Sequence, residues 1–127
     1  MSGWELISMN HSRASQVRRG EIWVAELDPA RGAEIRKTRP VVIISADGMG
    51  VLPVKLAAPC TTSGLPPALW RVPLPKSALN GLDRDTILDL MQIRSISVER
   101  LIRRIGSVDA DTMAEVAAMV AAIVEYE

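Results

Sequence analysis

The chain has 127 residues, of which 48% are apolar, so it is long enough for one domain with a hydrophobic core and too short for two ordinary domains. Its 15 basic and 15 acidic side chains cancel, which excludes a uniformly basic surface that would bind nucleic acids through net charge alone. A single cysteine, Cys60, excludes an internal disulfide, and a single histidine, His11, leaves no cluster for a zinc site, so we expect no metal and no cofactor.

The first 18 residues mix polar and apolar side chains without a period, and we interpret them as a flexible leader ahead of one domain over residues 19–127. The leader lacks the basic start and apolar stretch of a signal peptide. No run in the chain approaches the ~18 to 20 apolar residues that a membrane span needs. We therefore expect a cytoplasmic protein without membrane contact.

Three β-strands are predicted in the first half of the domain, over residues 21–27, 41–45 and 51–60. The first, EIWVAEL, ends at Asp28-Pro29, because proline cannot continue a ladder of backbone hydrogen bonds. Pro40 opens the second, VVIIS, whose unbroken apolar run is typical of a strand buried on both faces. A glycine-containing turn over residues 46–50 leads to the third strand, and the three form an antiparallel meander.

The second half is predicted to contain a loop at residues 65–67, an edge strand at 70–72, a helical turn at 76–81, and strands at 86–95 and 103–107. Side-chain alternation along the strand at 86–95 places Gln92 and Arg94 together on one face. Asp109 is a good N-cap for a C-terminal helix over residues 110–127, because its carboxylate can accept backbone N–H groups of the first turn. The fold class is therefore mainly β with a C-terminal α-helix.

The C-terminal helix carries apolar side chains on two sides. Larger residues recur at helical spacing on one side, Met113, Val116, Val120 and Ile123 among them, and the opposite side is rich in alanine. Together with the VVIIS strand, this is more apolar surface than a domain of this size easily covers, which favours a homodimer. The alternative is that the alanine-rich side is merely small and exposed.

Basic residues collect in two stretches, Arg31, Arg36, Lys37 and Arg39 in the first and Arg94, Arg100, Arg103 and Arg104 in the second. Such stretches are typical either of a basic groove on a neutral body or of a charged face exposed to solvent. Charge alone does not decide between the two.

Polar residues interrupt apolar strand ends, where binding and catalytic sites are usually built, in GAEIRKTRP at residues 32–40, APCTTSG at 58–64 and MQIRSIS at 91–97. Taken singly, each segment is typical of an ordinary turn, a charged hairpin loop or an outward strand face. In order, and preceded by GEIWVAELDP at residues 20–29, they resemble the MazF-type toxin endoribonucleases, the PemK/Kid-like family. That family has GDIWWVDLDP, a G-S-E-Q loop, then RPVVVVS, a P-x-T-[TS] segment, and QIR-[ST]-I before a closing helix.

The resemblance implies a small SH3-like β-barrel of the CcdB/Kid type that forms a homodimer. It also implies a sequence-selective, metal-independent endoribonuclease toxin that cleaves single-stranded RNA such as mRNA. Cleavage would proceed through the RNA 2′-hydroxyl and leave 2′,3′-cyclic phosphate and 5′-hydroxyl ends. A cognate, MazE-like antitoxin with an acidic, partly disordered tail would neutralise the toxin.

The family's catalytic glutamate, arginine and threonine match Glu34, Arg39 and Thr61. Cleavage through the 2′-hydroxyl needs a proton acceptor near that hydroxyl and positive donors on the phosphate. Glu34 would be the acceptor and Arg39 the bidentate phosphate clamp, since an arginine is a poor general acid. Thr61 would donate a hydrogen bond to the scissile phosphate.

RNA binding is assigned to Arg36, Lys37, Thr38, Thr62, Ser63, Gln92 and Arg94. In the family the segment that matches Gln92 and Arg94 lines the RNA groove, where an amide can read a base edge and a guanidinium can stack or hold phosphate. The chain departs from the family pattern at Met91, where an acid is usual, and at Ile35, where glutamine is common. These departures bear on groove contacts and on base specificity.

Two other functions remain open on the sequence. The chain could be a non-catalytic toxin that binds DNA gyrase, as CcdB-like relatives do, or a catalytically silent barrel that binds RNA or protein. Each candidate residue also has a structural interpretation: Arg39 would form a surface ion pair with Glu34 or Asp28, and Cys60 would be a small buried side chain.

Overall fold

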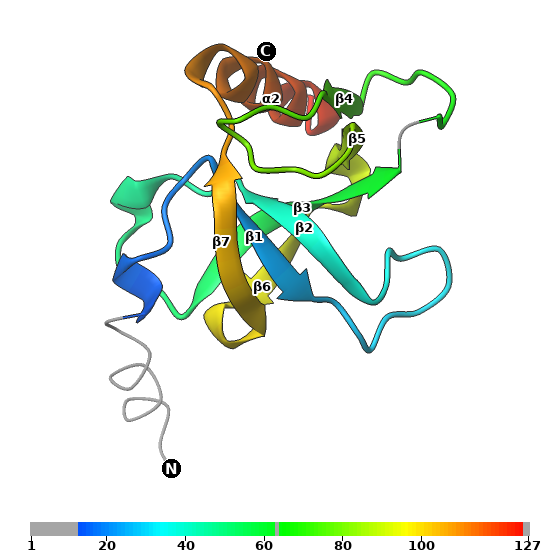
Figure 1. The fold of residues 1–127 in the computed structure, drawn as a ribbon. Coiled ribbons are helices and arrows are strands. Elements are labelled where there is room, and N and C mark those ends of the chain that lie inside the picture. The colour runs from blue at the N-terminus through cyan, green and yellow to red at the C-terminus, as the bar shows by residue number, and fades with distance from the viewer. Residues whose placement is uncertain (1–12, 63, 126–127) are drawn as a thin grey trace.

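The structure, a computed structural model, describes residues 13–62 and 64–125. Within them the strands are β1 (Glu21–Glu26), β2 (Thr38–Ile43), β3 (Val54–Thr62), β4 (Arg71–Leu74), β5 (Thr86–Asp89), β6 (Arg94–Ser97) and β7 (Leu101–Ser107), and the helix is α2 (Ala110–Ile123). Three 3-10 turns, η1 (Asp47–Met49), η2 (Leu90–Gln92) and η3 (Val98–Arg100), connect them. The predicted class, mainly β with a C-terminal helix, is confirmed (Figure 1).

The first three strands form the predicted antiparallel meander. Trp23 of β1 pairs with Val41 of β2, and Val41 pairs with Pro59 of β3. β7 joins the free edge of β1, and β5 and β4 extend the sheet beyond β3, so the strand order is β4-β5-β3-β2-β1-β7. The predicted edge strand at residues 70–72 is thus confirmed as β4, at one end of this path.

One continuous strand over residues 86–95 was a wrong prediction. β5 pairs with the C-terminal end of β3 and β6 with its N-terminal end, and the turn η2 separates them. The sequence alternates like a strand here because both pieces lie along the same β3. The chain bends between them at Asp89, whose carboxylate accepts the Met91 amide at 3.0 Å, and the bend turns Gln92 out of the sheet.

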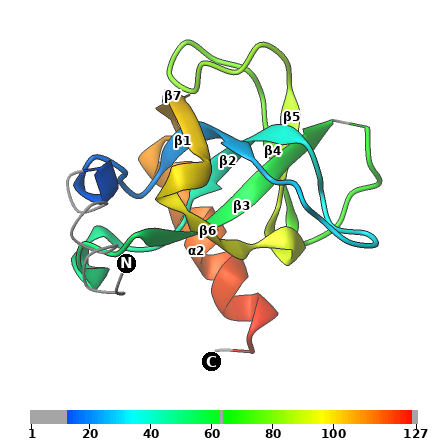
Figure 2. The same cartoon turned by 90° about the horizontal axis from the view of Figure 1, so that it is seen from below.

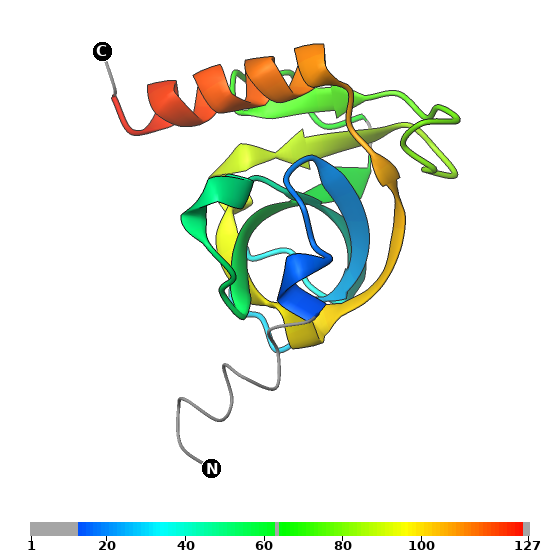
Figure 3. The same ribbon diagram turned by 90° about the vertical axis from the view of Figure 1, so that its left-hand side faces the viewer.

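The sheet curls as the predicted SH3-like barrel would, but it stays open (Figure 3). Strands β7, β1, β2, β3 and β6 wrap around one core. β6 and β7 are joined by η3, yet no backbone ladder links them among the described residues. The barrel shape therefore comes from the strong twist and coil of the strands, with a short 3-10 turn bridging the last gap.

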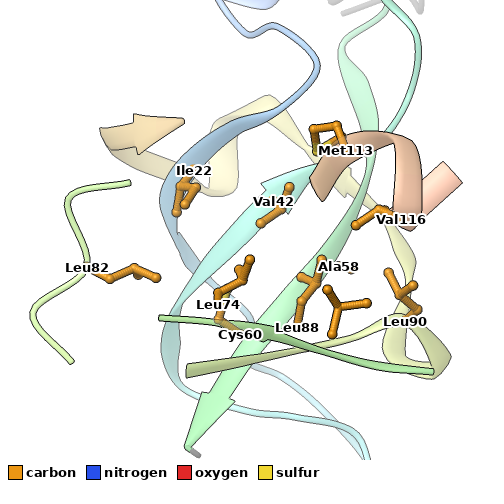
Figure 4. Packing of buried hydrophobic residues seen from close by; sticks show 11 residues of the cluster. Ile22, Val42, Ala58, Cys60, Leu74, Leu82, Leu88, Leu90, Met113 and Val116 are labelled. Carbon is orange, nitrogen blue, oxygen red and sulfur yellow. The ribbon is translucent and has the colours of Figure 1, made fainter. Parts of the chain in front are cut away.

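Two hydrophobic cores lie on opposite faces of the curled sheet. The inner cluster, inside the curl, consists of Ala14, Val17, Ala25, Leu27, Val41, Ile43, Ala57, Ile96, Val98 and Leu101. The outer cluster lies between the sheet, β4, β5 and α2 and includes Ile22, Val42, Ala58, Cys60, Leu88, Leu90, Met113 and Val116 (Figure 4). Val41 and Ile43 point inward and Val42 outward, so the prediction that this strand is buried on both faces is confirmed.

Helix α2 covers the outer cluster through Met113 and Val116, which are buried. Asp109 is its N-cap, as predicted, and accepts the Thr112 amide at 2.8 Å, a hydrogen bond that lowers the pKa of the Asp109 carboxyl. The helix ends at Ile123, four residues before the predicted end. It is too short to cross a membrane, and the other described residues contain no helix that could do so.

The predicted helical turn at residues 76–81, closed at Asn80-Gly81, is confirmed, because the Gly81 amide donates to the Ser77 carbonyl at 3.1 Å with the spacing of one α-helical turn. The Asn80 amide oxygen accepts the amides of Ser77 and Leu82, at 2.9 and 3.0 Å, and the Ser77 hydroxyl accepts the Asn80 backbone amide at 3.1 Å, so side chains cap this turn. Gly81 has a φ of 66°, and a Cβ there would lie 1.9 Å from the Ile105 carbonyl oxygen. The turn thus crosses the end of β7 at a distance that only glycine allows.

The leader enters the structure at residue 13. Residues 13–15 form a helical turn, and Ala14 and Val17 are buried in the inner cluster at 1% and 2% exposure. A side-chain N–H of Arg13 donates to the Leu101 carbonyl. This segment closes the curled sheet on one side, and the loop between β1 and β2 lies on the other (Figure 2). The rest of the leader, residues 1–12, lies outside the described residues, and its flexibility stays a prediction.

Candidate functional site

The loop between β1 and β2 is closed at its base by three hydrogen bonds. The Leu27 amide donates to the Lys37 carbonyl at 2.9 Å, the Lys37 amide to Oδ1 of Asp28 at 3.0 Å, and the Thr38 hydroxyl to Oε2 of Glu26 at 3.1 Å. Lys37 has a φ of 69°, a conformation uncommon for a residue with a side chain, and Asp28 binds its amide there. The base of the loop is therefore fixed.

Arg100 of η3 supports the same loop. Its Nη1 donates to the Glu26 carbonyl at 3.1 Å and to the Asp28 carbonyl at 2.7 Å. The sequence pattern did not indicate that Arg100 and Asp28 support the site. Arg100 is more than 70 residues from these carbonyls, and only the curl of the sheet brings it there. Asp28 offered a weak clue, because a short acidic side chain at a strand end often binds nearby amides.

Glu34 lies at the exposed tip of the loop. Its Oε1 accepts the Arg31 amide at 2.6 Å, and its own amide donates to the Arg31 carbonyl at 3.1 Å. These reciprocal bonds close a tight turn. Among the described residues no donor is bonded to Oε2, so this oxygen has capacity to accept a proton.

Gln92 bonds to the loop on both sides of Glu34. Its Oε1 accepts the Ile35 amide at 3.2 Å, and its Nε2 donates to the Ala33 carbonyl at 3.2 Å. The amide group predicted to read a base edge is thus engaged with the protein's own backbone. No feature of the sequence indicated this pairing, because the partners are almost 60 residues apart.

A hollow of about 300 Å³ opens between the loop and the η2 turn. Its walls are formed by Leu27, Ala33, Glu34, Ile35, Pro59, Met91, Gln92, Ile93 and Arg94. Aliphatic side chains make up most of the lining, with a carboxylate, an amide and a guanidinium among them. Arg94 reaches back across the hollow, where its Nη1 donates weakly to the Leu27 carbonyl at 3.4 Å. Three predicted site residues, Glu34, Gln92 and Arg94, are therefore brought together.

Arg39 and Thr61 lie on the strand ends beside this hollow rather than in its walls. The β2–β3 ladder ends at Val41 and Pro59, and the same register continued by two residues sets Arg39 opposite Thr61. By strand alternation Thr61 shares a face with Pro59, which lines the hollow. Both side chains are partly exposed, and the Nε of Arg39 donates to the Arg36 carbonyl at 3.4 Å.

Arg39 joins no ion pair within the described part of the chain, so the predicted structural pairing with Glu34 or Asp28 is absent there. Its charge is available to a ligand. Arg36, Lys37 and Thr38 are exposed around the loop base, and Thr62 is exposed at the end of β3. Ser63, also predicted to bind RNA, lies outside the described residues.

Cys60 precedes Thr61 but points to the opposite face, into the outer cluster, where it is 1% exposed. Burial raises the pKa of its thiol to about 12. It is therefore a neutral packing residue, as its structural interpretation held, and no nucleophile. Across residues 13–62 and 64–125, no three side chains of the metal-ligating types gather in one place.

Residues 18–124 match the family described as the PemK-like, MazF-like toxin of type II toxin-antitoxin systems. Because the match covers most of the chain, and the loop, β3 end and η2 turn all fall within it, the chain belongs to this family.

Individual relatives are also similar to this chain over most of its length. Endoribonuclease MazF9 of Mycobacterium tuberculosis is 40% identical over 108 residues, covering 78% of this chain and 88% of the relative. Endoribonuclease MazF of Staphylococcus epidermidis is 34% identical over 103 residues, covering 79% and 84%. Among solved structures, the Mycobacterium tuberculosis toxin MazF-mt6 superposes with a TM-score of 0.69 at 26% identity, over 84% of this chain and 98% of that one.

Proposed function

We propose that this protein is a toxin endoribonuclease that cuts single-stranded RNA in a sequence-selective way. Its relatives at 40% and 34% identity are named endoribonucleases. Two observations support the proposal: Glu34 and Pro59 line the same hollow, and the β2–β3 register sets Arg39 opposite Thr61, two residues beyond Pro59.

The chemistry follows from these side chains. Glu34 accepts the proton of the RNA 2′-hydroxyl as that oxygen attacks the adjacent phosphorus. Arg39 and Thr61 donate hydrogen bonds to the phosphate oxygens and stabilise the charge that builds up on them. The bond from phosphorus to the 5′ oxygen breaks, a proton from solvent reaches that oxygen, and the products are a 2′,3′-cyclic phosphate and a 5′-hydroxyl. Side chains and solvent supply every step, so no metal is required.

The surroundings of the site suit a single strand of RNA. The exposed Arg36 and Lys37 would hold phosphates beside the hollow, with Thr38 and Thr62 as hydrogen-bond donors. The apolar walls would take an unstacked base, and Arg94 would stack on it or bind a phosphate. A single-stranded target fits better than a duplex, whose bases are not free to enter a hollow.

The partners follow from the family. A toxin of a type II system is paired with a protein antitoxin, and we propose a cognate, MazE-like antitoxin whose acidic, partly disordered tail binds the basic loop around Arg36 and Lys37. The protein acts in the cytoplasm, where mRNA is found, as a homodimer.

The test is cleavage of a long transcript by the purified protein in the presence of EDTA, followed by mapping of the new ends. We expect discrete cuts with 5′-hydroxyl ends at a recurring short sequence. Glu34→Gln should slow cleavage by about 10²- to 10⁴-fold, whereas Glu115→Gln, on the exposed side of α2, should leave it unchanged. Cleavage that disappears in EDTA and returns with Mg²⁺ would overturn the metal-independent mechanism. Intact RNA together with inhibited DNA gyrase would instead support the gyrase-binding alternative.

A further inference from the structure

The two hydrogen bonds of Gln92 flank one residue. One goes to the carbonyl of Ala33 and the other to the amide of Ile35, at 3.2 Å each, and Glu34 is the residue between them. A glutamine side-chain amide that bonds two neighbouring peptide groups fixes the Cα of the enclosed residue and the direction of its side chain. Gln92 therefore holds the backbone on both sides of Glu34 by hydrogen bonds and forms none with the Glu34 carboxylate.

Gln92 is carried by a firmer part of the molecule than the loop it holds. The η2 turn, which ends at Gln92, is anchored by Leu90, which is fully buried in the outer cluster and whose amide donates to the Trp70 carbonyl at 2.9 Å. The Asp89 carboxylate caps the same turn. On the loop side, Ala33 and Glu34 are exposed and only Ile35 packs against the inner cluster. The two hydrogen bonds of Gln92 thus connect the exposed loop tip to a well-packed turn and restrict its motion.

We propose that Gln92 is a positioning residue that holds Glu34 in place for abstraction of the 2′-hydroxyl proton, rather than a reader of a base edge. This inference rests on the proposed function. A general base loses rate steeply when its position relaxes by about 1 Å. An exposed loop tip closed only by its own tight turn would relax in this way without the η2 connection.

The variants follow from the two bonds. Gln92→Leu keeps the size and removes both, so cleavage of a short RNA spanning one mapped site should slow by about 10- to 100-fold at saturating RNA. Gln92→Glu keeps the acceptor for Ile35 but faces the Ala33 carbonyl with an acceptor, so it should restore little. The matched control is Gln16→Leu, because Gln16 is the chain's other glutamine and lies exposed in the leader.

A double-mutant cycle separates positioning from direct RNA contact. If Gln92 acts through Glu34, adding Gln92→Leu to Glu34→Gln should slow the single-turnover rate by less than about 3-fold further, since residues that act as one unit are not additive. The same loss in both backgrounds, or weaker RNA binding with an unchanged saturated rate, would overturn the proposal in favour of base reading.

A second measurement needs no RNA and keeps this inference distinct from the proposed function. In the free protein, hydrogen exchange followed by NMR should show the Ile35 amide protected, and Gln92→Leu should remove that protection while the core amides stay protected. Equal exchange of the Ile35 amide in the wild type and in Gln92→Leu would refute the hydrogen bond between Gln92 and the loop. Protection lost as expected in a protein that cuts no RNA would refute the proposed function and leave the contact standing.

Discussion

Arg39 combines a fixed backbone with a free charge. Its backbone is paired with Ala25 across the β1–β2 ladder, and its guanidinium is in no ion pair among the described residues. Arg39→Ala should therefore stay folded and slow the saturated cleavage rate by about 10²- to 10³-fold, the usual effect of losing one preorganised donor to developing charge. Arg39→Lys keeps the charge without the bidentate fork and should recover only part of the rate. Single-turnover kinetics measure both; a folded Arg39→Ala protein that cuts at the wild-type rate would contradict the assignment.

Substitution of Arg94 is expected to change RNA binding rather than the cleavage rate. It lines the hollow, and its only hydrogen bond within the described residues is the weak one to the Leu27 carbonyl. Arg94→Ala should weaken RNA binding and reduce the salt dependence of the binding constant by about one phosphate contact, while the rate at saturating RNA changes little. Titrations at several salt concentrations test this. A collapse of the saturated rate with unchanged affinity would place Arg94 in the chemistry instead.

The Cys60 thiol is expected to make the free energy of unfolding depend on pH in the alkaline range. Its pKa rises from 9.0 to about 12 on folding because it is buried, so the folded state holds a proton that the unfolded state releases above pH 9. The thiol's contribution to stability is complete below the unfolded value and declines as the pH rises toward the folded one. Between about pH 8 and about pH 10, Cys60→Ala should therefore lose less free energy of unfolding than the wild type. Equal losses in denaturant titrations would argue against a buried, neutral thiol.

At the scale of elements, the Asn80–Gly81 turn crosses β7 at a distance that leaves no room for a Cβ at Gly81. Gly81→Ala would place a methyl group against the Ile105 carbonyl and strain a φ of 66° as well. We expect the free energy of unfolding to fall by more than about 2 kcal/mol.

Gly48→Ala is the matched control for this substitution. Gly48 lies in η1 with open space around its Cα, and its φ is outside the left-handed region. Its free energy of unfolding should stay within about 0.5 kcal/mol of the wild-type value. Equal denaturation midpoints for the two variants would mean that the turn yields easily.

The meander and the capped helix were predictable because alternation, proline placement and an N-cap aspartate are local features. The 86–95 segment was mispredicted for a physical reason: its two halves satisfy strand alternation against the same neighbour, and the break depends on the Asp89 cap, which a strand pattern does not reveal. The turn at 76–81 was predictable, because asparagine and glycine at its end are local turn signals.

The candidate site was only partly accessible to sequence reasoning. Family motifs pointed to Glu34, Arg39 and Thr61, and the strand register sets the last two across from each other. No motif indicated the residues that hold the loop in place, which are Arg100 at its base and Gln92 on both sides of Glu34. Such contacts join segments 57 to 74 residues apart and exist only once the sheet has curled.

For the whole molecule, the structure changes the reason to expect a homodimer. The VVIIS strand needs no partner, since Val41, Val42 and Ile43 are covered by the chain's own two cores. Exposed apolar side chains gather instead around η1 and the start of β3, where Met49 is 68% and Leu52 48% exposed beside a hollow of about 290 Å³. A second copy covering this patch would remove an unusually apolar region from water.

The dimer prediction is checked by light scattering at micromolar concentration, where the mass should be that of two chains. Leu52→Lys should shift it to one chain by placing a charge in the apolar patch. Leu69→Lys changes an equally large side chain, 79% exposed near the alanine-rich side of α2, and should leave the dimer intact. If Leu69→Lys is the variant that dissociates, the interface lies on the helix side.

The position of Ala14 and Val17 has a consequence for how such a toxin persists. Both side chains belong to the inner cluster, and the segment that carries them lies on the opposite side of the curled sheet from the β1–β2 loop, so substitutions there should change how often the fold opens and leave the candidate site intact. Proteases degrade a protein in proportion to the time it spends open. Substitutions at these two positions would therefore change the half-life of the toxin when it is not bound to its antitoxin. Evolution could adjust this half-life independently of which RNA is cut.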